Sequence, residues 1–274
     1  MSSKLSIGYQ LFSAREEAQK DLFGTLEHIR EYGYDGVEFA GFFGKTAKEL
    51  RHAMKDIGLK PFSSHVPLQQ ILEDPNGVIE YHQELGAHYI AVPYLEEACR
   101  PGTPKFASVL NTIYRFGRKC KKADLTLLYH NHDFEFVELS GQTALDFLFD
   151  AIPEDLLSTE IDTCWVKYSG VDPAAYIAKY AGRCPVVHLK DFEGVRGDNP
   201  PYMLIGLPQT EAPKDVPFCF KPVGYGCQNV RSLIDAAHKA GAKWVVVEQD
   251  QSPERPPLEA ARMSIDTIGA ILRD

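Results

Sequence analysis

The 274-residue chain alternates short apolar runs with helical patterns eight times, and this alternation constrains its fold more than any other feature. Each run is rich in β-branched and aromatic residues and is nearly continuously apolar, as in the Trp-Val-Val-Val stretch at 244–247. Strands of this kind are buried on both faces of a parallel sheet, with helices packed outside it. Eight such units close a barrel of about 250 residues. We therefore predict an α/β fold with a single (β/α)8 barrel domain over residues 1–274.

The periodicity of the apolar residues and the stop signals place the individual elements. Strands are expected at residues 5–11, 36–40, 59–66, 88–94, 125–131, 158–165, 185–191 and 244–250. Helices are expected at residues 16–32, 46–57, 75–85, 103–123, 143–151, 173–180, 229–240 and 258–272. The stretch 192–226, after the seventh strand, is rich in Pro and Gly and too long for an ordinary connection. Such a length indicates a lid or a binding loop.

The charge pattern narrows the range of partners. The formal net charge is −9, and no run of Lys and Arg forms a basic stripe, which argues against binding to nucleic acid or to a membrane surface. No apolar stretch reaches the roughly 18 residues of a membrane-spanning helix, and residues 1–8 lack the apolar core of a signal peptide. We expect a cytoplasmic protein. The six cysteines show no CxxC pair, and free thiols are expected in a reducing compartment.

Four of the expected strands end in a residue that can bind a metal ion. The apolar runs within strands five to eight stop at His130, Asp162, His188 and Glu248. In a parallel barrel the ends of adjacent strands point into one mouth, so these side chains can converge. Imidazole and carboxylate ligands suit Mn²⁺, Zn²⁺, Fe²⁺ or Co²⁺. We predict that these four residues hold a divalent metal. Glu160 competes with Asp162, because it lies two residues earlier on the same strand face, and a capping or rim role is the alternative for each residue.

Other polar and aromatic residues are expected near the same mouth. Glu248, His65 and Glu135 are the candidate catalytic groups, because each could remove a proton next to a carbonyl. His132 could contact the substrate or replace a ligand, although an exposed polar loop is an equal alternative for His132 and Glu135. Lys190 could bind a substrate oxygen, or it could pair with Asp191. The predicted substrate-binding residues are Glu38, His132, Lys190, Asp191 and Trp165.

Several stretches resemble the xylose isomerase-like TIM-barrel family, whose members are widely labelled sugar phosphate isomerases/epimerases. The resemblance runs nearly end to end, through Gly36-Val-Glu-Phe, Ser64-His65, Tyr129-His-Asn-His-Asp-Phe-Glu-Phe, Ile161-Asp162-Thr, Val187-His188-Leu-Lys-Asp191, Pro222-Val-Gly-Tyr-Gly226 and Val247-Glu248. It implies one divalent metal, most often Mn²⁺, with Zn²⁺, Co²⁺, Fe²⁺ or Mg²⁺ as alternatives, held by Glu, Asp, His and Glu. Asp162, His188 and Glu248 match the last three ligands, but His130 stands where the family has Glu.

The resemblance implies enolisation of a small keto sugar or cyclitol, because it covers ketose 3-epimerases, inosose dehydratases and 3-keto-glycoside lyases. In the 3-epimerases two glutamates face opposite sides of the substrate, and His130 replaces one of them. We expect a metal-dependent isomerase or epimerase. A lyase or dehydratase, a non-catalytic sugar-binding barrel and metal-assisted phosphodiester hydrolysis are the alternatives. Lys190 and Arg196 are the few cations near the mouth, so a phosphorylated substrate is not indicated. The sequence leaves homo-oligomer formation open.

Overall fold

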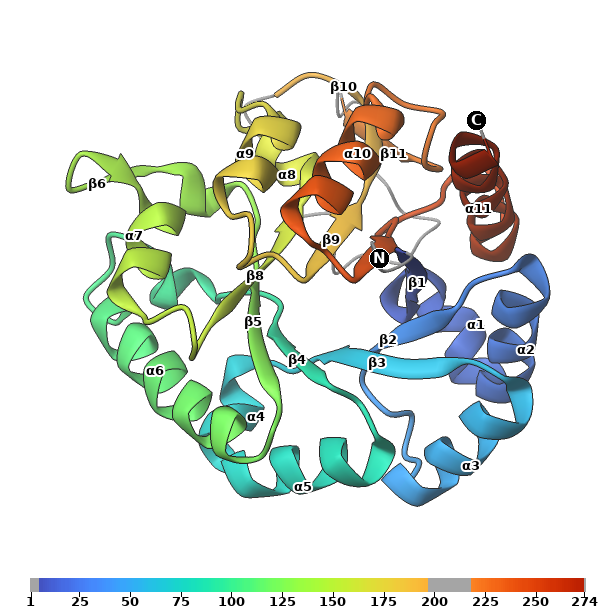
Figure 1. Ribbon diagram of the computed structural model, residues 1–274, viewed down its shortest axis with the longest axis horizontal. Coiled ribbons are helices and arrows are strands. Elements are labelled where there is room, and N and C mark those ends of the chain that lie inside the picture. The colour runs from blue at the N-terminus through green and yellow to red at the C-terminus, as the bar shows by residue number, and fades with distance from the viewer. Residues whose placement is uncertain (1–4, 197–217, 274) are drawn as a thin grey trace.

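A closed barrel of eight parallel strands forms the centre of the molecule, as the computed structural model shows for residues 5–196 and 218–273 (Figure 1). Around the barrel the strands follow the order β1-β12-β9-β8-β5-β4-β3-β2. They are β1 (Ser6–Gln10), β2 (Gly36–Ala40), β3 (Lys60–His65), β4 (Tyr89–Val92), β5 (Thr126–His130), β8 (Ser158–Asp162), β9 (Val186–Leu189) and β12 (Trp244–Val247). The predicted (β/α)8 TIM barrel is thereby confirmed.

Helices surround the strands on the outside of the barrel (Figure 1). They are α1 (Arg15–Lys20), α2 (Leu22–Tyr32), α3 (Ala47–Ile57), α4 (Leu68–Glu73), α5 (Pro75–Leu85), α6 (Phe106–Lys122), α7 (Ala144–Ala151), α8 (Thr163–Tyr168), α9 (Pro173–Lys179), α10 (Val230–Ala240) and α11 (Pro257–Arg273). Short 3-10 helices are η1 (Leu11–Ala14), η2 (Glu97–Cys99) and η3 (Phe134–Phe136). Two small antiparallel sheets pair β6 (Glu138–Leu139) with β7 (Gln142–Thr143) and β10 (Asp191–Gly194) with β11 (Phe218–Lys221).

Three local predictions were wrong in detail, and each has a physical reason. The helix expected at 16–32 is two helices, because Asp21 caps α2 by accepting a hydrogen bond from the Gly24 N–H. The strand expected at 158–165 ends at Asp162, which caps α8. Part of the expected loop 192–226 forms the antiparallel pair of β10 and β11, while its residues 197–217 lie outside the described residues.

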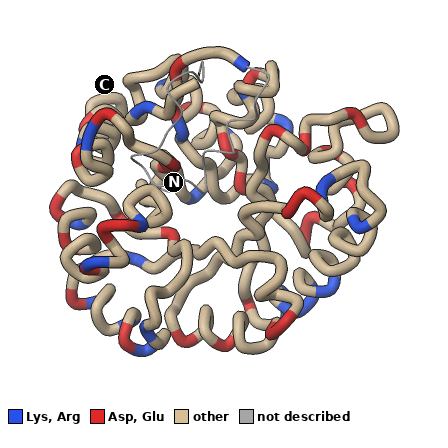
Figure 2. The backbone as a smooth tube through the Cα atoms, turned by 180° about the vertical axis from the view of Figure 1, so that it is seen from behind, with Lys and Arg blue, Asp and Glu red and all other residues tan. Residues whose placement is uncertain are grey.

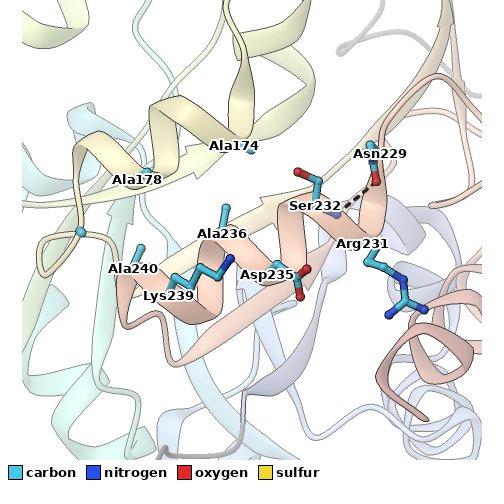
Figure 3. Close-up of a pocket in the computed structure, with 10 residues that line it drawn as sticks. Ala174, Ala178, Asn229, Arg231, Ser232, Asp235, Ala236, Lys239 and Ala240 are labelled. Carbon is cyan, nitrogen blue, oxygen red and sulfur yellow. Dashed lines mark hydrogen bonds between the residues drawn. The ribbon is translucent and has the colours of Figure 1, made fainter. Parts of the chain in front are cut away.

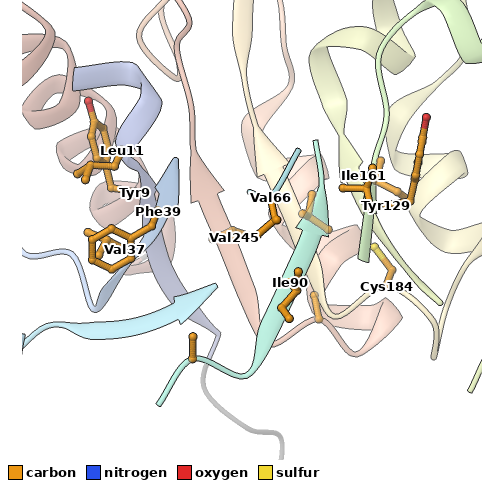
Figure 4. Close-up of a cluster of buried hydrophobic side chains, with 14 of the residues drawn as sticks. Tyr9, Leu11, Val37, Phe39, Val66, Ile90, Tyr129, Ile161, Cys184 and Val245 are labelled. Atoms are coloured by element: carbon orange, nitrogen blue, oxygen red, sulfur yellow. The ribbon is translucent and has the colours of Figure 1, made fainter. Parts of the chain in front are cut away.

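Apolar side chains fill both sides of the strands. Strand residues such as Val37, Phe39, Ile161 and Val245 belong to the cluster of buried side chains drawn in Figure 4. Inside the barrel, a second cluster contains Phe62, Tyr89, Ala91, Leu128, Val186, Trp244 and Val246. Since side chains alternate along a strand, residues 244, 246 and 248 share the inner face of β12 and of its extension. The apolar cluster therefore lies toward the amino ends, and the polar residues lie at the carboxyl ends.

The close packing inside the barrel explains one glycine at the start of a strand. A Cβ atom on Gly36 would lie 2.5 Å from the Lys60 backbone oxygen and 2.9 Å from the Trp244 ring. The Trp244 ring also stacks on Phe62 at a centroid distance of 3.9 Å. Glycine at this position lets the ring pair close the lower end of the barrel, which leaves the opposite end for the polar side chains.

The outer surface of the barrel carries charges of both signs (Figure 2), and the cysteines are reduced. Lys and Arg alternate with Asp and Glu over the outer helices (Figure 2). Within the described chain, none of the helices combines the length and the apolar character needed to cross a bilayer. All six cysteines are free thiols.

A buried carboxylate ties the α7 region to α9. The Asp146 side chain accepts hydrogen bonds from the hydroxyls of Tyr176 at 2.8 Å and Tyr180 at 2.6 Å, and it forms an ion pair with Lys179 at 2.8 Å. Burial alone would raise the pKa of Asp146, but hydrogen bonds from Lys179 and Tyr180 lower it below its usual value. The ionised form therefore stabilises the folded state above the ordinary carboxyl pKa, and this stabilisation is lost as the pH falls through the lowered pKa.

We expect Asp146→Asn to lower the free energy of unfolding at neutral pH by about 1–3 kcal/mol, because charged hydrogen bonds are lost. The deficit should shrink as the pH falls below about 4, where the wild-type carboxylate becomes protonated. Urea unfolding of both proteins at neutral and acidic pH measures it. Asp150→Asn, at an exposed position of the same helix, is the control. If Asp146→Asn lowers the free energy of unfolding by the same amount at all pH values, the charge of Asp146 is not what stabilises the folded state.

Candidate metal centre

The four residues predicted as metal ligands lie together at the carboxyl ends of β5, β8, β9 and β12. These strands are consecutive neighbours in the barrel. The pairing sets His130 beside Glu160 and Asp162 beside His188. One ligand atom from each of His130, Asp162, His188 and Glu248 lies within 4.8 Å of those of the other three, and all four residues are buried. We call these four residues the outer set.

The contacts within the outer set leave room for a cation. The His188 Nδ1 atom lies 2.8 Å from Glu248 Oε2, while His130 Nε2 lies 3.7 Å from Asp162 Oδ2 and 3.9 Å from Glu248 Oε2. Metal bonds to these atoms are about 2.0–2.2 Å long, so ligand atoms on one ion are separated by distances of this order. The arrangement is compatible with one divalent metal.

Asp162 shows most clearly how the local fold prepares a ligand. Its Oδ1 accepts hydrogen bonds from the backbone N–H groups of Cys164 at 2.8 Å and Trp165 at 3.1 Å, which fixes the carboxylate at the start of α8. Its Oδ2 is buried and has no hydrogen-bond partner. Such an atom needs an explanation, because buried polar atoms are nearly always satisfied. The Lys190 Nζ atom is 3.4 Å away, so a cation bound at Oδ2 would supply a closer partner.

Lys190 is a fixed positive charge beside the outer set. Its Nζ lies 2.7 Å from Asp250, 3.3 Å from Glu248 and 3.4 Å from Asp162. Burial alone would lower the pKa of Lys190, but attraction by these carboxylates raises it well above its usual value. The alternative that Lys190 pairs with Asp191 is therefore wrong. The sequence analysis missed Asp250, although it lies two residues beyond Glu248.

The two carboxylates of the outer set experience different fields. Burial raises the pKa of Asp162 to about 7, with Lys190 partly opposing this effect. Burial also acts on Glu248, but Lys190 and His188 hold its pKa well below the usual value. Glu248 is therefore ionised and can accept a proton, while Asp162 is the carboxylate that depends more on an added cation.

Glu38, His65 and Glu160 lie deeper in the same mouth. His65 Nε2 is 2.7 Å from Glu160 Oε1, and Glu38 Oε2 is 2.8 Å from His188 Nε2. Glu38 also accepts a hydrogen bond from Gln10 at 2.9 Å. The sequence analysis preferred Asp162 to Glu160 as a metal ligand. In the structure, Glu160 also lies among the histidines. The structure brings both acidic residues of β8 into the centre.

A cavity of about 620 Å³ opens over the centre. The predicted residues that line it are His65, His130, His132, Lys190 and Glu248, together with Asp250. The rest of the lining is largely apolar and consists of Phe12, Ala40, Gly41, Phe42, Pro67, Gln70, Pro93 and Tyr94. Glu38, Glu135, Asp162, Asp191 and Trp165 are not part of this lining. The cavity therefore has a polar wall around the centre and an apolar wall on the side of β1 to β4.

Comparisons with known proteins agree with this architecture. Residues 26–270 match the family described as xylose isomerase-like TIM barrel. The chain belongs to this family. It is similar to inosose dehydratase from Geobacillus kaustophilus strain HTA426, with 24% identity over 90% of this chain and 86% of that protein.

Solved structures of other proteins show the same fold. A sugar phosphate isomerase/epimerase from Parabacteroides distasonis superposes with a TM-score of 0.76 and 21% identity, covering 98% of this chain and 95% of that one. The IolI protein with a bound zinc atom superposes with a TM-score of 0.72 and 13% identity, covering 98% of both chains.

In this xylose isomerase-like barrel, Glu135 is placed away from the cavity. It is fully buried, its Oε1 accepts a hydrogen bond from Tyr129 at 2.6 Å, and its Oε2 accepts one from the His132 N–H at 2.8 Å. Burial raises the pKa of Glu135 to about 8. The side chain holds the turn after β5 in place. His132 is thereby positioned at the cavity, with its ring stacked between Phe134 and Trp165.

Asp191 organises backbone rather than facing the cavity. Its Oδ1 accepts hydrogen bonds from the N–H groups of Phe192 and Gln228, and its Oδ2 accepts them from Gly224 and Gly226. A Cβ atom on Gly226 would lie 2.3 Å from Asp191 Oδ1, so glycine is needed for this approach. The sequence prediction of substrate binding by Asp191 has no support in this geometry.

A groove of about 460 Å³ lies elsewhere, between α9 and α10 on the outside of the barrel. Figure 3 shows Ala174, Ala178, Ala236 and Ala240 along it, with the charged ends of Arg231, Asp235 and Lys239 beside it. No residue of the centre lines this groove. The chemistry is concentrated at the barrel mouth.

We expect Asp191→Asn to lower the free energy of unfolding by about 2–4 kcal/mol, because an amide nitrogen cannot accept the N–H bonds now made to one carboxylate oxygen. Amide hydrogen exchange should accelerate at Gly224 and Gly226. Exposed Asp235→Asn makes the same chemical change without such bonds and serves as the control. If amide exchange at Gly224 and Gly226 is unchanged in Asp191→Asn, Asp191 does not hold this backbone in place.

Proposed function

We propose that this protein is a divalent-metal-dependent enzyme that enolises a small keto sugar or cyclitol, with isomerisation or epimerisation as the outcome. The observation that carries the proposal is the convergence of His130, Asp162, His188 and Glu248 beneath a cavity of substrate size. A divalent ion held by these groups supplies Lewis-acid polarisation of a carbonyl. The name of the curated relative, inosose dehydratase, supports a cyclitol or sugar substrate.

The side chains around the cavity have distinct roles in this scheme. Glu248 is ionised and lines the cavity, so it removes the proton from the carbon next to the carbonyl. The Lys190 ammonium faces the same space and donates a hydrogen bond to the substrate oxygen on which negative charge develops. Glu248, once protonated, returns the proton to the substrate, while His65 lines the cavity on the neighbouring side, 9% exposed at its side chain, and is placed to contact the substrate.

Dehydration is the second candidate outcome, and a specific feature favours it. The two carboxylates of the outer set come from β8 and the end of β12, while β5 contributes the imidazole of His130. The paired carboxylate bases implied for a 3-epimerase are therefore absent from this set. A single carboxylate base suits removal of a proton followed by loss of a β-hydroxyl group, which leaves as water after taking up that proton. The relatives named inosose dehydratase agree with this outcome.

The cavity lining indicates a neutral substrate that carries an apolar group. Lys190 is the one Lys or Arg in the lining, and three carboxylates already compensate its charge. A phosphate group would find no free cation there among the described residues. The opposite wall contains Phe12, Phe42 and Tyr94. A polyol head would lie at the centre, while an alkyl or aromatic substituent would pack on this wall.

We expect Glu248→Gln to lower the rate of C–H exchange by about 10²–10⁴-fold, the usual contribution of a general base. The measurement incubates the Mn²⁺-loaded protein with inososes, ketoses and 3-keto-glycosides in D₂O and follows deuterium uptake by NMR. Deuterium in recovered or isomerised substrate supports isomerase or epimerase chemistry, and an unsaturated ketone supports dehydration.

The control variant Glu193→Gln, changed at an exposed position, should catalyse C–H exchange of the substrate at the wild-type rate. If the wild-type protein produces no exchange with any of these substrates, the proposed enolisation is wrong and a sugar-binding role takes its place. If Glu248→Gln exchanges as fast as the wild type, Glu248 is not the base.

We expect Phe12→Ala to raise KM for an aryl- or alkyl-substituted substrate by about 10-fold or more, the value of burying one large apolar side chain. KM for the unsubstituted polyol should change little. Phe23→Ala is the matched control, because Phe23 is similarly half-buried but lies on α2, outside the cavity lining. If Phe12→Ala changes KM equally for both substrates, the apolar wall does not determine substrate specificity.

A further inference from the structure

The deeper residues form a second group of potential ligands below the outer set. One ligand atom from each of His65, His130, Glu160 and His188 lies within 4.8 Å of the others. Glu160 Oε1 is 2.7 Å from His65 Nε2, 3.2 Å from His188 Nε2 and 3.3 Å from His130 Nδ1. Glu38 Oε2 lies 2.8 Å from His188 Nε2 and 3.3 Å from His65 Nε2. These atoms come from five strands, β2, β3, β5, β8 and β9, and lie around one point.

The oxygen atoms of this group are incompletely satisfied. Glu38 and Glu160 are both 0% exposed, and Glu38 Oε1 and Glu160 Oε2 have no hydrogen-bond partner. The buried Nδ1 atom of His130, which faces Glu160, also has none. Leaving carboxylate oxygens buried without partners costs free energy. The unpartnered His130 Nδ1 faces the same Glu160 Oε1 that His65 and His188 approach, and the two unpartnered oxygens belong to the same two carboxylates, so the group as a whole lacks a ligand.

The charge of the whole centre supports the same conclusion. Five buried carboxylates meet in it, those of Glu38, Glu160, Asp162, Glu248 and Asp250. Among the described residues, Lys190 is the one Lys or Arg that forms an ion pair with any of them. With all five carboxylates ionised and the histidines neutral, as in metal ligands, one dication and Lys190 together leave two negative charges without compensation. A second dication would balance them, and buried charges need such compensation.

His188 separates the two groups and can serve both without losing a proton. A neutral imidazole has one N–H donor and one lone pair. With its Nε2 lone pair directed at the deeper group, the Nδ1–H donates to Glu248 Oε2, 2.8 Å away. Metal-binding histidines commonly donate their other N–H to a carboxylate in this way. His130 then uses Nε2 for the outer ion, and its Nδ1–H faces Glu160.

We propose that the protein has a second divalent-cation site, formed by Glu38, His65, Glu160 and His188. Two imidazoles and two carboxylates suit Mn²⁺, Fe²⁺, Co²⁺ or Zn²⁺. With both ions bound, the outer ion is held by His130, Asp162 and Glu248 and faces the cavity, while His188 binds the inner ion and orients Glu248 through its Nδ1–H. The inner ion joins β2, β3, β8 and β9 and fixes the orientation of His188. The protein therefore binds two divalent ions per chain.

The test counts bound Mn²⁺ on the full-length protein after chelator treatment and dialysis. Mn²⁺ is chosen because it disfavours thiolate ligands, so the free cysteines do not add to the count. Equilibrium dialysis should give two ions for the wild type and one each for Glu160→Gln and Asp162→Asn. Mn²⁺ should also raise the Tm of the wild type more than that of Glu160→Gln, because each bound ion stabilises the folded state. Exposed Glu259→Gln should keep two ions.

One ion per wild-type chain at saturation would overturn the proposal. So would two ions in the wild type that Glu160→Gln leaves unchanged, since the second would then lie elsewhere. If Glu160→Gln does not fold by circular dichroism, Glu38→Gln replaces it, and the wild-type count decides in any case. A single ion that is lost in Asp162→Asn would leave the proposed enolisation standing, because that reaction needs the outer ion.

Discussion

The cost of burying carboxylates at the mouth of the barrel is the constraint on which the rest of the structure depends. Each isolated buried carboxylate costs several kcal/mol even after relaxation of the protein. Five of them meet here, with one lysine and three central histidines as the available partners. Such a cluster is stable only when the geometry of every partner is fixed, and the barrel supplies that rigidity through its closed strand pairing.

The pairing of parallel strands sets the spacing of these groups. Residues 160 and 162 project to the same side of β8, while the neighbouring strands place His130 beside Glu160 and His188 beside Asp162. Two layers of acid and imidazole result, one above the other. Lys190 comes directly after β9 and reaches only the upper layer. The position of the lysine thus makes the two layers electrostatically different.

Much of the fold and part of the centre could be predicted from the sequence. Apolar runs that end in His130, Asp162, His188 and Glu248 are local signals, and parallel strands convert the end of a run into a shared mouth. The start of α8 could not be read in this way, because Thr163, Cys164 and Trp165 look like a strand and only the Asp162 cap ends it. A local hydrogen bond there overrides the apolar pattern.

The role of each polar residue was harder to predict, because it depends on contacts between distant segments. Asp191 is one residue from Lys190, yet it binds backbone N–H groups at 224–228, while Lys190 reaches Asp250. Glu135 looks like a cavity residue in the sequence, but the outward-facing Tyr129 holds it behind β5. No spacing rule distinguishes these outcomes. Only the three-dimensional position of the partner decides whether a carboxylate faces a ligand or the backbone.

His130, at the end of β5, affects how negative charge is distributed between the two layers. With His130 in a position where the family resemblance implies Glu, the outer set loses one negative charge, but the paired residue of β8 is Glu160. A carboxylate therefore remains next to the centre, one layer deeper and on the adjacent strand. This displacement moves negative charge away from the cavity and toward His65 and His188. It leaves Glu248 as the ionised carboxylate of the outer set that lines the cavity, which makes the site asymmetric toward any bound substrate.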